Sequence, residues 1–328
     1  MRDRTSGISR RTLFRSTAAA GVGLAATGGL SAPVRAAAPL LGAERPSFYR
    51  FDLGDFEVTP LLDGAIQLDG PHPIFGENVD ASEVQALAEQ NFLPPDRMSI
   101  SFTPVIVNTG EQLIMFDSGN GGGRRPDAGR LAELFESAGF ATSEVDIVVI
   151  THFHPDHIGG LMEGGAPLFP NASYVANEAE YDFWSAEDKL SGPTERVATL
   201  TQSNVVPLAD KMTFLKDGGE VVSGITAVDA SGHTPGHTAF HLESAGARLM
   251  ISADTANHYI VSLQRPDWHV RFDMDKEAAV AARKKVFGMI AADRIPFTGY
   301  HMPFPALGYI QQIDTGFRYV PASYQLDL

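Results

Sequence analysis

Four potential metal ligands occur within six consecutive positions of this 328-residue chain: His152, His154, Asp156 and His157. Imidazole and carboxylate groups hold zinc-like divalent ions and leave a coordination position open for a reactive water. Residues 145–150, just before them, are mostly β-branched and predict a short buried strand, so the first two histidines can leave it pointing the same way. Pro155 suits the first turn of a helix, which would direct the last two ligands toward a second ion. The motif predicts a metal-dependent enzyme.

Three further strand-like runs each end in a residue type that can bind a metal. Residues 225–230 precede the motif Gly232-His-Thr-Pro-Gly-His237, in which His233 stands at the strand exit. A second apolar run ends at Asp254, and a third ends at His301. We therefore expect a site along one edge of a sheet assembly, built from ligands that are distant in the chain. The sequence contains no cysteine, which excludes thiol catalysis and thiolate ligands.

The order of these motifs, H-x-H-x-D-H, G-H-T-P-G-H, S-A-D-T and G-Y-H, resembles that of the metallo-β-lactamase superfamily of binuclear hydrolases, from about Phe48 to the end of the chain. Residues 48–57, 116–119 and 300–305 look closest to its methyl parathion hydrolase branch. The lactonases that open N-acyl homoserine lactones are similar at the metal motifs. The resemblance implies an α+β fold, namely a four-layer αββα sandwich with metals between the edges of its two sheets.

Carried over residue by residue, the resemblance implies two metal sites joined by one carboxylate. The first ion would be bound by His152, His154 and His233, and the second ion by Asp156, His157 and His301. Asp254 would bridge the two ions. Seven ligands exceed what one tetrahedral ion can use, which independently favours two ions about 3.5 to 4 Å apart. A bridging water would ionise near pH 7 instead of about 15.7 and act as the nucleophile. Zinc is the expected metal, with manganese, iron and cobalt as alternatives.

Other residues are candidates for supporting roles in this chemistry. Asp254 would also pass a proton to the leaving oxygen, and His258, four residues later, would contact the substrate. Asp117 would orient a ligand histidine, and His237 would brace its loop by hydrogen bonding. The candidate residues of the substrate pocket, the first of them implied by the methyl parathion hydrolase resemblance, are Trp184, Asn257, Phe272 and Met274.

Apolar pocket candidates with few polar groups suit a small hydrophobic ester or lactone as substrate. Residues 119–125 lack the aromatic of the methyl parathion hydrolase branch, which weakens the phosphotriester interpretation. Asn257 stands where the lactonases have a tyrosine, so that pattern is also imperfect. We expect hydrolysis of esters or lactones, with hydrolysis of organophosphate triesters as the alternative. Two weaker alternatives are β-lactam hydrolysis and a non-catalytic, exported protein that binds a metal or a ligand. A homodimer paired through residues 48–56 is a further hypothesis.

Residues 1–38 resemble a twin-arginine export signal, and residues 39–328 are expected to form one hydrolase domain. Arg10 and Arg11 precede a weakly hydrophobic stretch at residues 17–30 and small residues suited to cleavage at 36–38. The stretch is too short and too glycine-rich for a stable membrane anchor, so we expect a periplasmic or secreted protein. Loss of residues 1–38 would leave 19 of 25 basic and 39 of 40 acidic residues, changing the formal charge from −15 to −20. Such acidity argues against a nucleic-acid partner.

The remaining chain alternates strand-like and helical runs without a linker. We expect ten strands, at residues 48–53, 56–62, 103–108, 112–116, 147–150, 173–176, 212–215, 225–228, 238–243 and 248–252. We expect four helices, at residues 127–138, 178–186, 195–202 and 276–292, the last with apolar residues at helical spacing.

Overall fold

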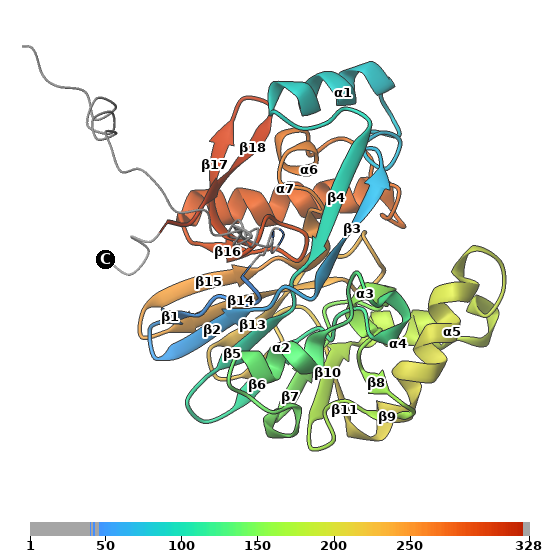
Figure 1. Cartoon of the computed structure of the whole chain (residues 1–328), viewed down its shortest axis with the longest axis vertical. Helices are drawn as coiled ribbons and strands as arrows, with labels where there is room; N and C mark the ends of the chain where they lie inside the picture. Colours follow the sequence, from blue (N-terminus) through green and yellow to red (C-terminus); the bar gives the residue numbers. More distant parts are fainter. Residues whose placement is uncertain (1–39, 41, 43–45, 324–328) are drawn as a thin grey trace, which may run out of the picture. The chain divides into compact units, whose positions relative to one another are not determined.

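Short apolar, largely β-branched runs form two seven-stranded sheets in this computed structural model, which describes residues 40, 42 and 46–323 (Figure 1). The first sheet contains, in spatial order, β1 (Phe51–Leu53), β2 (Phe56–Pro60), β5 (Val105–Asn108), β6 (Leu113–Phe116), β7 (Ile147–Val149), β10 (Ser173–Asn177) and β11 (Met212–Leu215). The second contains β12 (Glu220–Val222), β13 (Ile225–Asp229), β14 (Thr238–Ser244), β15 (Ala247–Ile251), β16 (Phe297–Thr298), β17 (Leu307–Ile313) and β18 (Gly316–Pro321). The export signal predicted at residues 1–38 lies outside the described residues.

An apolar layer fills the space between the two sheets. The rings of Phe116 on β6 and Phe240 on β14 meet edge to face, with their centroids 5.3 Å apart. Val107 and Leu242 are fully buried in the same cluster, and each such side chain contributes about 1.5 to 3 kcal/mol by leaving water. Strands β6, β7, β10 and β11 pair in parallel and lie at the centre and one edge of the first sheet. Every residue of β6 is buried, as expected for a strand covered on both faces.

Helices cover the outer face of each sheet. Those packed on the first sheet are α2 (Leu131–Ser137), α4 (Glu178–Ser185) and α5 (Glu195–Asn204), which share an apolar cluster with Val148 and Tyr174. On the second sheet, α7 (Lys276–Asp293) buries Phe287 against Phe297. The layers therefore follow the order helix, sheet, sheet, helix, which confirms the predicted α+β, αββα fold. Short 3₁₀ turns are η1 (Gly122–Arg124), η2 (Thr142–Glu144), η3 (Glu187–Lys189), η4 (Gly192–Thr194), η5 (Val206–Lys211) and η6 (Ala253–Thr255).

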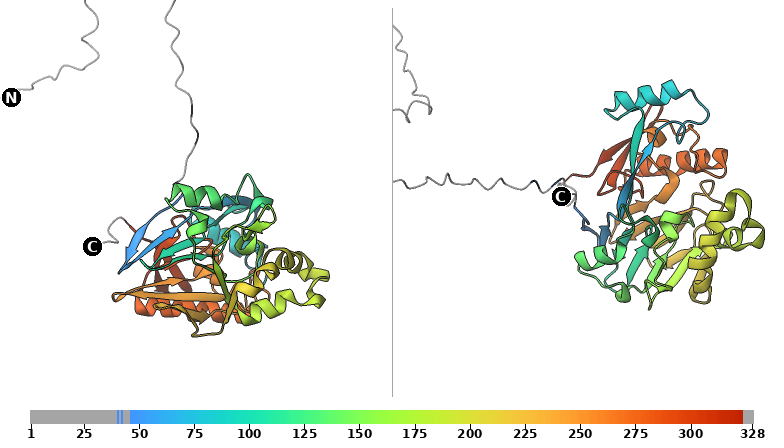
Figure 2. Two further views of the ribbon diagram at one scale, coloured as in Figure 1. Left: turned by 90° about the horizontal axis from the view of Figure 1, so that it is seen from below. Right: turned by 45° about the vertical axis from the view of Figure 1, so that its right-hand side comes forward.

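A separate two-stranded ribbon extends beyond the sheets and was not expected from the sequence. It pairs β3 (Gly64–Asp69) with β4 (Arg97–Phe102). An apolar cluster joins this ribbon to α1 (Ala81–Gln90) and α6 (Val261–Gln264), so it forms a wall above the sheet edges (Figures 1 and 2). The remaining elements are α3 (Pro155–Ile158) and the ribbon β8 (Met162–Glu163) with β9 (Ala166–Pro167). Within the described residues, no helix combines the length and the apolar character needed to cross a bilayer.

Candidate metal centre

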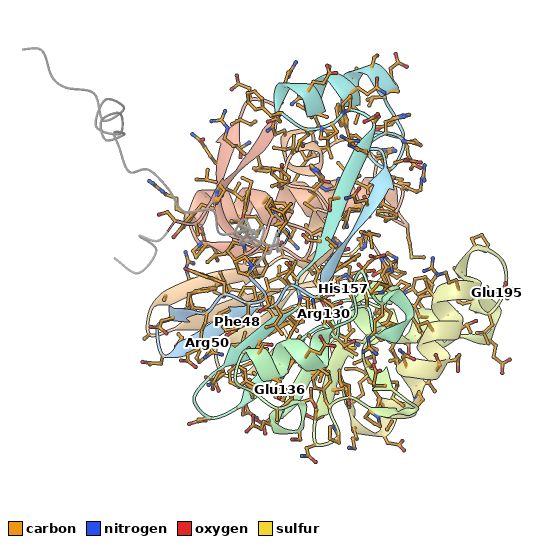
Figure 3. All side chains as sticks on the ribbon, in the orientation of Figure 1. Phe48, Arg50, Arg130, Glu136, His157 and Glu195 are labelled. Carbon is orange, nitrogen blue, oxygen red and sulfur yellow. The ribbon has the colours of Figure 1, made fainter. Side chains whose placement is uncertain are left out.

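The first ligand motif lies where the chain leaves β7. Thr151 is fixed there because its main-chain N–H and its hydroxyl both donate to the carboxylate of Asp117, at 2.8 and 2.9 Å. His152 follows, fully buried, and His154 stands in extended conformation immediately before α3. Pro155 occupies the first turn of that helix, as predicted, and the turn brings the buried His157 back over the sheet edge (Figure 3).

The other ligands lie in three loops of the second sheet. His233 lies between β13 and β14, Asp254 lies in η6 directly after β15, and His301 follows β16. The backbone of Gly232 has φ 128° and touches α7 so closely that a Cβ there would lie 2.2 Å from the main-chain nitrogen of Ala279. Only glycine fits at this position, because both the positive φ and the close approach exclude a side chain.

The structure brings all seven predicted ligands together around Asp254. Two groups have ligand atoms within 4.8 Å of one another, and Asp254 belongs to both: His152, His154, His233 and Asp254; and Asp156, His157, His301 and Asp254. The Nε2 atoms of His233 and His301 lie 3.3 and 3.0 Å from Oδ2 of Asp254. Nε2 of His157 lies 3.3 Å from Oδ1 of the same carboxylate. The division into two groups follows the division implied by the superfamily resemblance.

Buried polar atoms without a partner indicate that these residues fit divalent cations. Nε2 of His152, Nε2 of His157 and Oδ1 of Asp254 are buried and have no hydrogen-bond partner among the described residues. Leaving a buried polar atom unpaired costs about 1 to 3 kcal/mol, so three in one cluster indicate that another partner belongs there. Neutral imidazoles and carboxylates together suit zinc and other first-row divalent metals.

The far nitrogens of the ligand histidines are held from outside the cluster. Nδ1 of His157 lies 2.8 Å from Asp117, as the sequence predicted. Nδ1 of His233 lies 2.8 Å from Asp273, which in turn accepts a 2.8 Å bond from the fully buried Arg283. Nδ1 of His301 faces the main-chain oxygen of Ser101 on β4 at 2.8 Å. Each contact turns Nε2 toward Asp254 and fixes the ring.

His237 holds Asp254 and does not belong to either ligand group. Its Nδ1 donates to the carbonyl of Ala230 at 2.9 Å, so its Nε2 is free to accept from the main-chain N–H of Asp254 at 3.0 Å. Burial and the nearby His233 lower the pKa of His237 to about 3, which keeps the ring neutral. This geometry matches the bracing role expected for it.

Sequence reasoning missed three residues that organise the site: Glu180, Asp273 and Arg283. The buried carboxylate of Glu180 accepts from Phe153 N–H, between the first two ligands, and from Gly236 N–H, in the loop that carries His233. Burial raises the pKa of Glu180, although these bonds oppose it. A helix pattern at residues 178–186 indicated a buried face, but nothing local indicated which loops that face would meet.

The ionisable groups inside the cluster shift one another's pKa values. Burial opposes ionisation of Asp254, but His301 and His157 outweigh it and hold its pKa well below the usual range. Burial also opposes protonation of His233, yet Asp254 and Asp273 raise its pKa to about 9. Burial and the neighbouring His157 instead hold the pKa of His152 well below its usual value. Protons on some of these rings compensate the negative charge of the carboxylates, as a bound metal ion would. Metal binding must therefore release these protons.

A cavity of about 190 Å³ opens onto this centre. Its metal-side residues include Asp254 and His301, and its apolar wall comes from the ribbon residues Ile100 and Phe102 together with Phe272. Arg124, whose guanidinium lies 5.3 Å from the ring centroid of Phe102, adds positive charge to the lining. Asn257 also lines the cavity and donates to Oδ2 of Asp254 at 2.9 Å. The structure thus places Asn257 and Phe272 where the sequence suggested.

Three residues predicted to contact the substrate do not line this cavity. Trp184 is only 2% exposed, packs behind His154 in the core and donates its indole N–H to Glu180, because α4 turns that face inward. Met274 is 40% exposed and does not line the cavity. His258 also lies outside the lining, because Nδ1 accepts from the N–H groups of Ile260 and Val261 at the start of α6.

The family model of the metallo-beta-lactamase superfamily matches residues 103–296, more than half of the chain. The chain belongs to this superfamily. Curated relatives, described as probable metallo-hydrolases of Mycobacterium bovis and Mycobacterium tuberculosis, are 25% identical over 185 residues. The match covers 47% of this chain and 56% of theirs, so the chain spans about half the length of the curated relatives it matches.

Solved structures share the fold over most of the chain. AidC, a dizinc quorum-quenching lactonase in complex with a product, N-hexanoyl-L-homoserine, is 28% identical, with a TM-score of 0.79 over 85% of this chain and 98% of its own. The hydrolase AbOPH has the same TM-score over 86% and 100% of the two chains, and at 24% identity this likeness speaks for the fold alone.

Proposed function

We propose that this metallo-β-lactamase superfamily member is a metal-dependent hydrolase that opens lactones and esters with short apolar groups. The observation that carries the proposal is the convergence of two ligand groups on one buried carboxylate, Asp254, which also lines a cavity with an apolar wall. The three unpartnered ligand atoms fit a cation in each group. The likeness to a dizinc lactonase favours lactones as substrates and zinc as the metal.

Two divalent ions held by these residues would supply an ionised water for attack and polarise the substrate carbonyl. The chain's own groups do the rest. Asp254 is held at Oδ2 by Asn257, and its carboxylate can carry the proton of the attacking water to the leaving oxygen. Phe102 and Phe272 bind the apolar part of the substrate and keep water away from the reacting groups.

The decisive experiment is a substrate panel with purified enzyme whose metal content has been measured. The panel contains N-hexanoyl homoserine lactone, a γ- and a δ-lactone, an aryl ester, methyl paraoxon and a cephalosporin, ranked by kcat/KM. We expect the lactones and the ester to lead. A lead for methyl paraoxon would instead place the chain with the methyl parathion hydrolases, and a lead for the cephalosporin would overturn the proposal.

Replacing Asp254 by Asn tests whether the ligand groups are catalytic. We expect kcat/KM on the best substrate to fall more than about a hundredfold, because the variant loses both a shared metal ligand and a proton carrier. His241→Asn is the matched control, since His241 lies on β14 outside both ligand groups. Unchanged turnover in Asp254→Asn would favour a non-catalytic metal- or ligand-binding protein.

We also propose that residues 1–38 direct export of the chain through the twin-arginine route, to the periplasm or the medium. The adjacent Arg10 and Arg11 and the following Ala/Gly stretch support this. The homodimer stays a prediction, which light scattering of the purified protein checks.

A further inference from the structure

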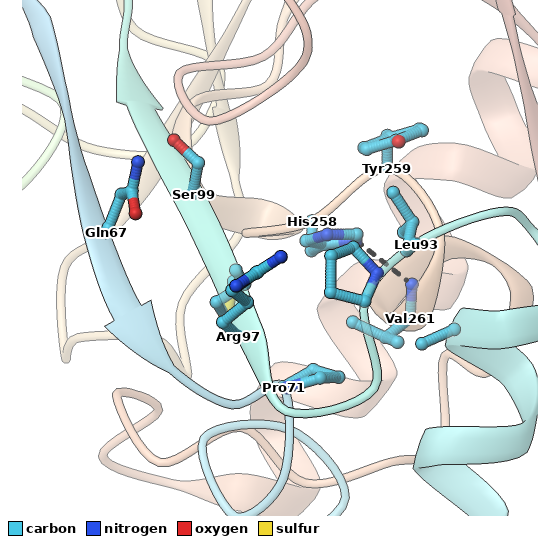
Figure 4. Close-up of a pocket in the computed structure, with 11 residues that line it drawn as sticks. Gln67, Pro71, Leu93, Arg97, Ser99, His258, Tyr259 and Val261 are labelled. Carbon is cyan, nitrogen blue, oxygen red and sulfur yellow. Dashed lines mark hydrogen bonds between the residues drawn. The ribbon is translucent and has the colours of Figure 1, made fainter.

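A second cavity, of about 330 Å³, lies against the opposite face of the β3–β4 ribbon (Figure 4). On β4, Ile100 and Phe102 line the cavity at the metal centre, whereas Arg97 and Ser99, together with Met98 between them, line this second cavity. Gln67 on β3 joins the latter pair. The volume is within the range of cavities that bind small molecules.

The polar anchor of this cavity is the side chain of His258. It is 7% exposed and fixed between Tyr259, which stacks on it, and the edge of Phe75. Because Nδ1 accepts from the N–H groups of Ile260 and Val261, at 3.0 and 3.3 Å, the ring proton lies on Nε2. None of the described residues accepts the proton on Nε2 of His258. This atom is also not one of the side-chain atoms that are buried from solvent and lack a hydrogen-bond partner. A hydrogen-bond donor is therefore free to meet a ligand.

The charge of the cavity has one sign. Arg97 is its single charged lining residue, in a chain with a formal net charge of −15. Strand register pairs Arg97 with Asp69, yet none of the described carboxylates lies within 4.0 Å of its guanidinium. In Figure 4 the guanidinium end of Arg97 points toward His258. An unpaired guanidinium beside a free imidazole N–H suits a carboxylate, which accepts from both.

The apolar part of the lining determines the rest of the ligand. Apolar side chains, among them Pro71, Leu93, Pro94 and Val261, supply most of the lining, and Gln67, Ser99 and Tyr259 add uncharged hydrogen-bonding groups. A ligand with one anionic head and a short aliphatic portion matches this lining, in which Arg97 is the single charged residue.

We propose that this cavity is a second ligand site, separate from the metal centre, which binds a small carboxylate with a short aliphatic chain through Arg97 and His258. Hydrolysis of lactones and esters releases acids of this class, so the reaction product is the natural occupant if the proposed function holds; this last point alone rests on that function. A third cavity shares Ser99, His258 and Tyr259 with this one and is also lined by His301, so the ligand site lies close to a candidate metal ligand.

The test must resolve the two sites, because carboxylates also bind metals. We would titrate the metal-loaded full-length protein with hexanoate and follow the methyl NMR signals of Leu93 and Val261 at the cavity and of Ile66 and Ile100 at the metal centre. We expect saturable shifts at both places. Arg97→Gln should weaken the cavity response about tenfold and leave the metal-centre response unchanged. Arg318→Gln, an exposed arginine on β18, is the matched control.

Two further arms make the outcome decisive. Ser99→Leu should fill the cavity and remove the response of Leu93 and Val261, and hexanol, which lacks the charge, should bind at least tenfold more weakly than hexanoate. Shifts confined to Ile66 and Ile100, equal affinity in Arg97→Gln, or equal binding of hexanol would each overturn the proposal. None of these readouts depends on catalytic turnover, so failure of the ligand site and failure of the hydrolase function are distinguishable.

Discussion

The buried pair Asp273 and Arg283 offers the sharpest test of how the metal centre is held. Both side chains are fully enclosed, and the guanidinium also donates to the carbonyls of Thr255 and Pro266. Asp273→Asn keeps the volume but leaves the buried charge of Arg283 without its anion. Breaking one side of such a pair costs about 3 to 5 kcal/mol of unfolding free energy. Because His233 also loses its carboxylate partner, we expect metal affinity to fall about 10- to 100-fold.

The matched control is Asp293→Asn, which removes an exposed partner of Arg248. The side chains of Asp293 and Arg248 are 42% and 35% exposed, so this control should lose only about 0.2 to 1 kcal/mol of unfolding free energy. Urea unfolding with and without a chelator measures the free energies, and competition with a chelating dye measures metal affinity. A loss in Asp273→Asn no larger than in Asp293→Asn, or an unchanged metal affinity, would refute the reasoning.

A double variant separates the two roles of Asp273. In Asp273→Asn with Arg283→Met the uncompensated buried charge is gone, so much of the lost stability should return. Metal affinity should stay low, because His233 still lacks the carboxylate. Burial raises the pKa of Asp273, but His233 and Arg283 outweigh it and lower the pKa below 3.8. Its contribution to stability is therefore present above about pH 3.8 and is lost as the pH falls through the folded-state pKa, and the acid limb should flatten in Asp273→Asn.

Three other outcomes are expected. Because Asp254 and Asp273 outweigh burial and raise the pKa of His233 to about 9, the metal must displace this proton. The apparent metal affinity should therefore rise at least about tenfold per pH unit as the pH increases toward 9, whereas a pH-independent dissociation constant would contradict the assignment. Phe102→Ala should raise KM for N-hexanoyl homoserine lactone about tenfold and change KM little for an unsubstituted γ-lactone, measured in parallel. Replacing Arg10 and Arg11 by lysines should retain the protein in the cytoplasm, measured by fractionation; unchanged export would exclude the twin-arginine route.

Local sequence patterns determined most of the two sheets and their covering helices. All ten predicted strands are present with ends shifted by a few residues, because each is a short apolar run that must be buried whatever surrounds it. The ribbon β3–β4 was missed although β4 alternates in burial, since its face is buried only by α1 and α6. The hairpin of β17 and β18 was missed for a similar reason, because its apolar residues meet α7, far away in the chain.

The sequence by itself also identified the seven candidate metal ligands that the structure brings together, because imidazoles and carboxylates at strand exits have few other uses at that density. Only the tertiary structure determined which residues hold these side chains in place and which residues line the cavity beside them. Asp273 and Arg283 became partners of His233 only when α7 packed beside its loop, and Trp184 turned into the core because α4 covers the first sheet. Periodicity tells which face of an element a residue occupies, whereas the neighbour that covers this face comes from distant parts of the chain.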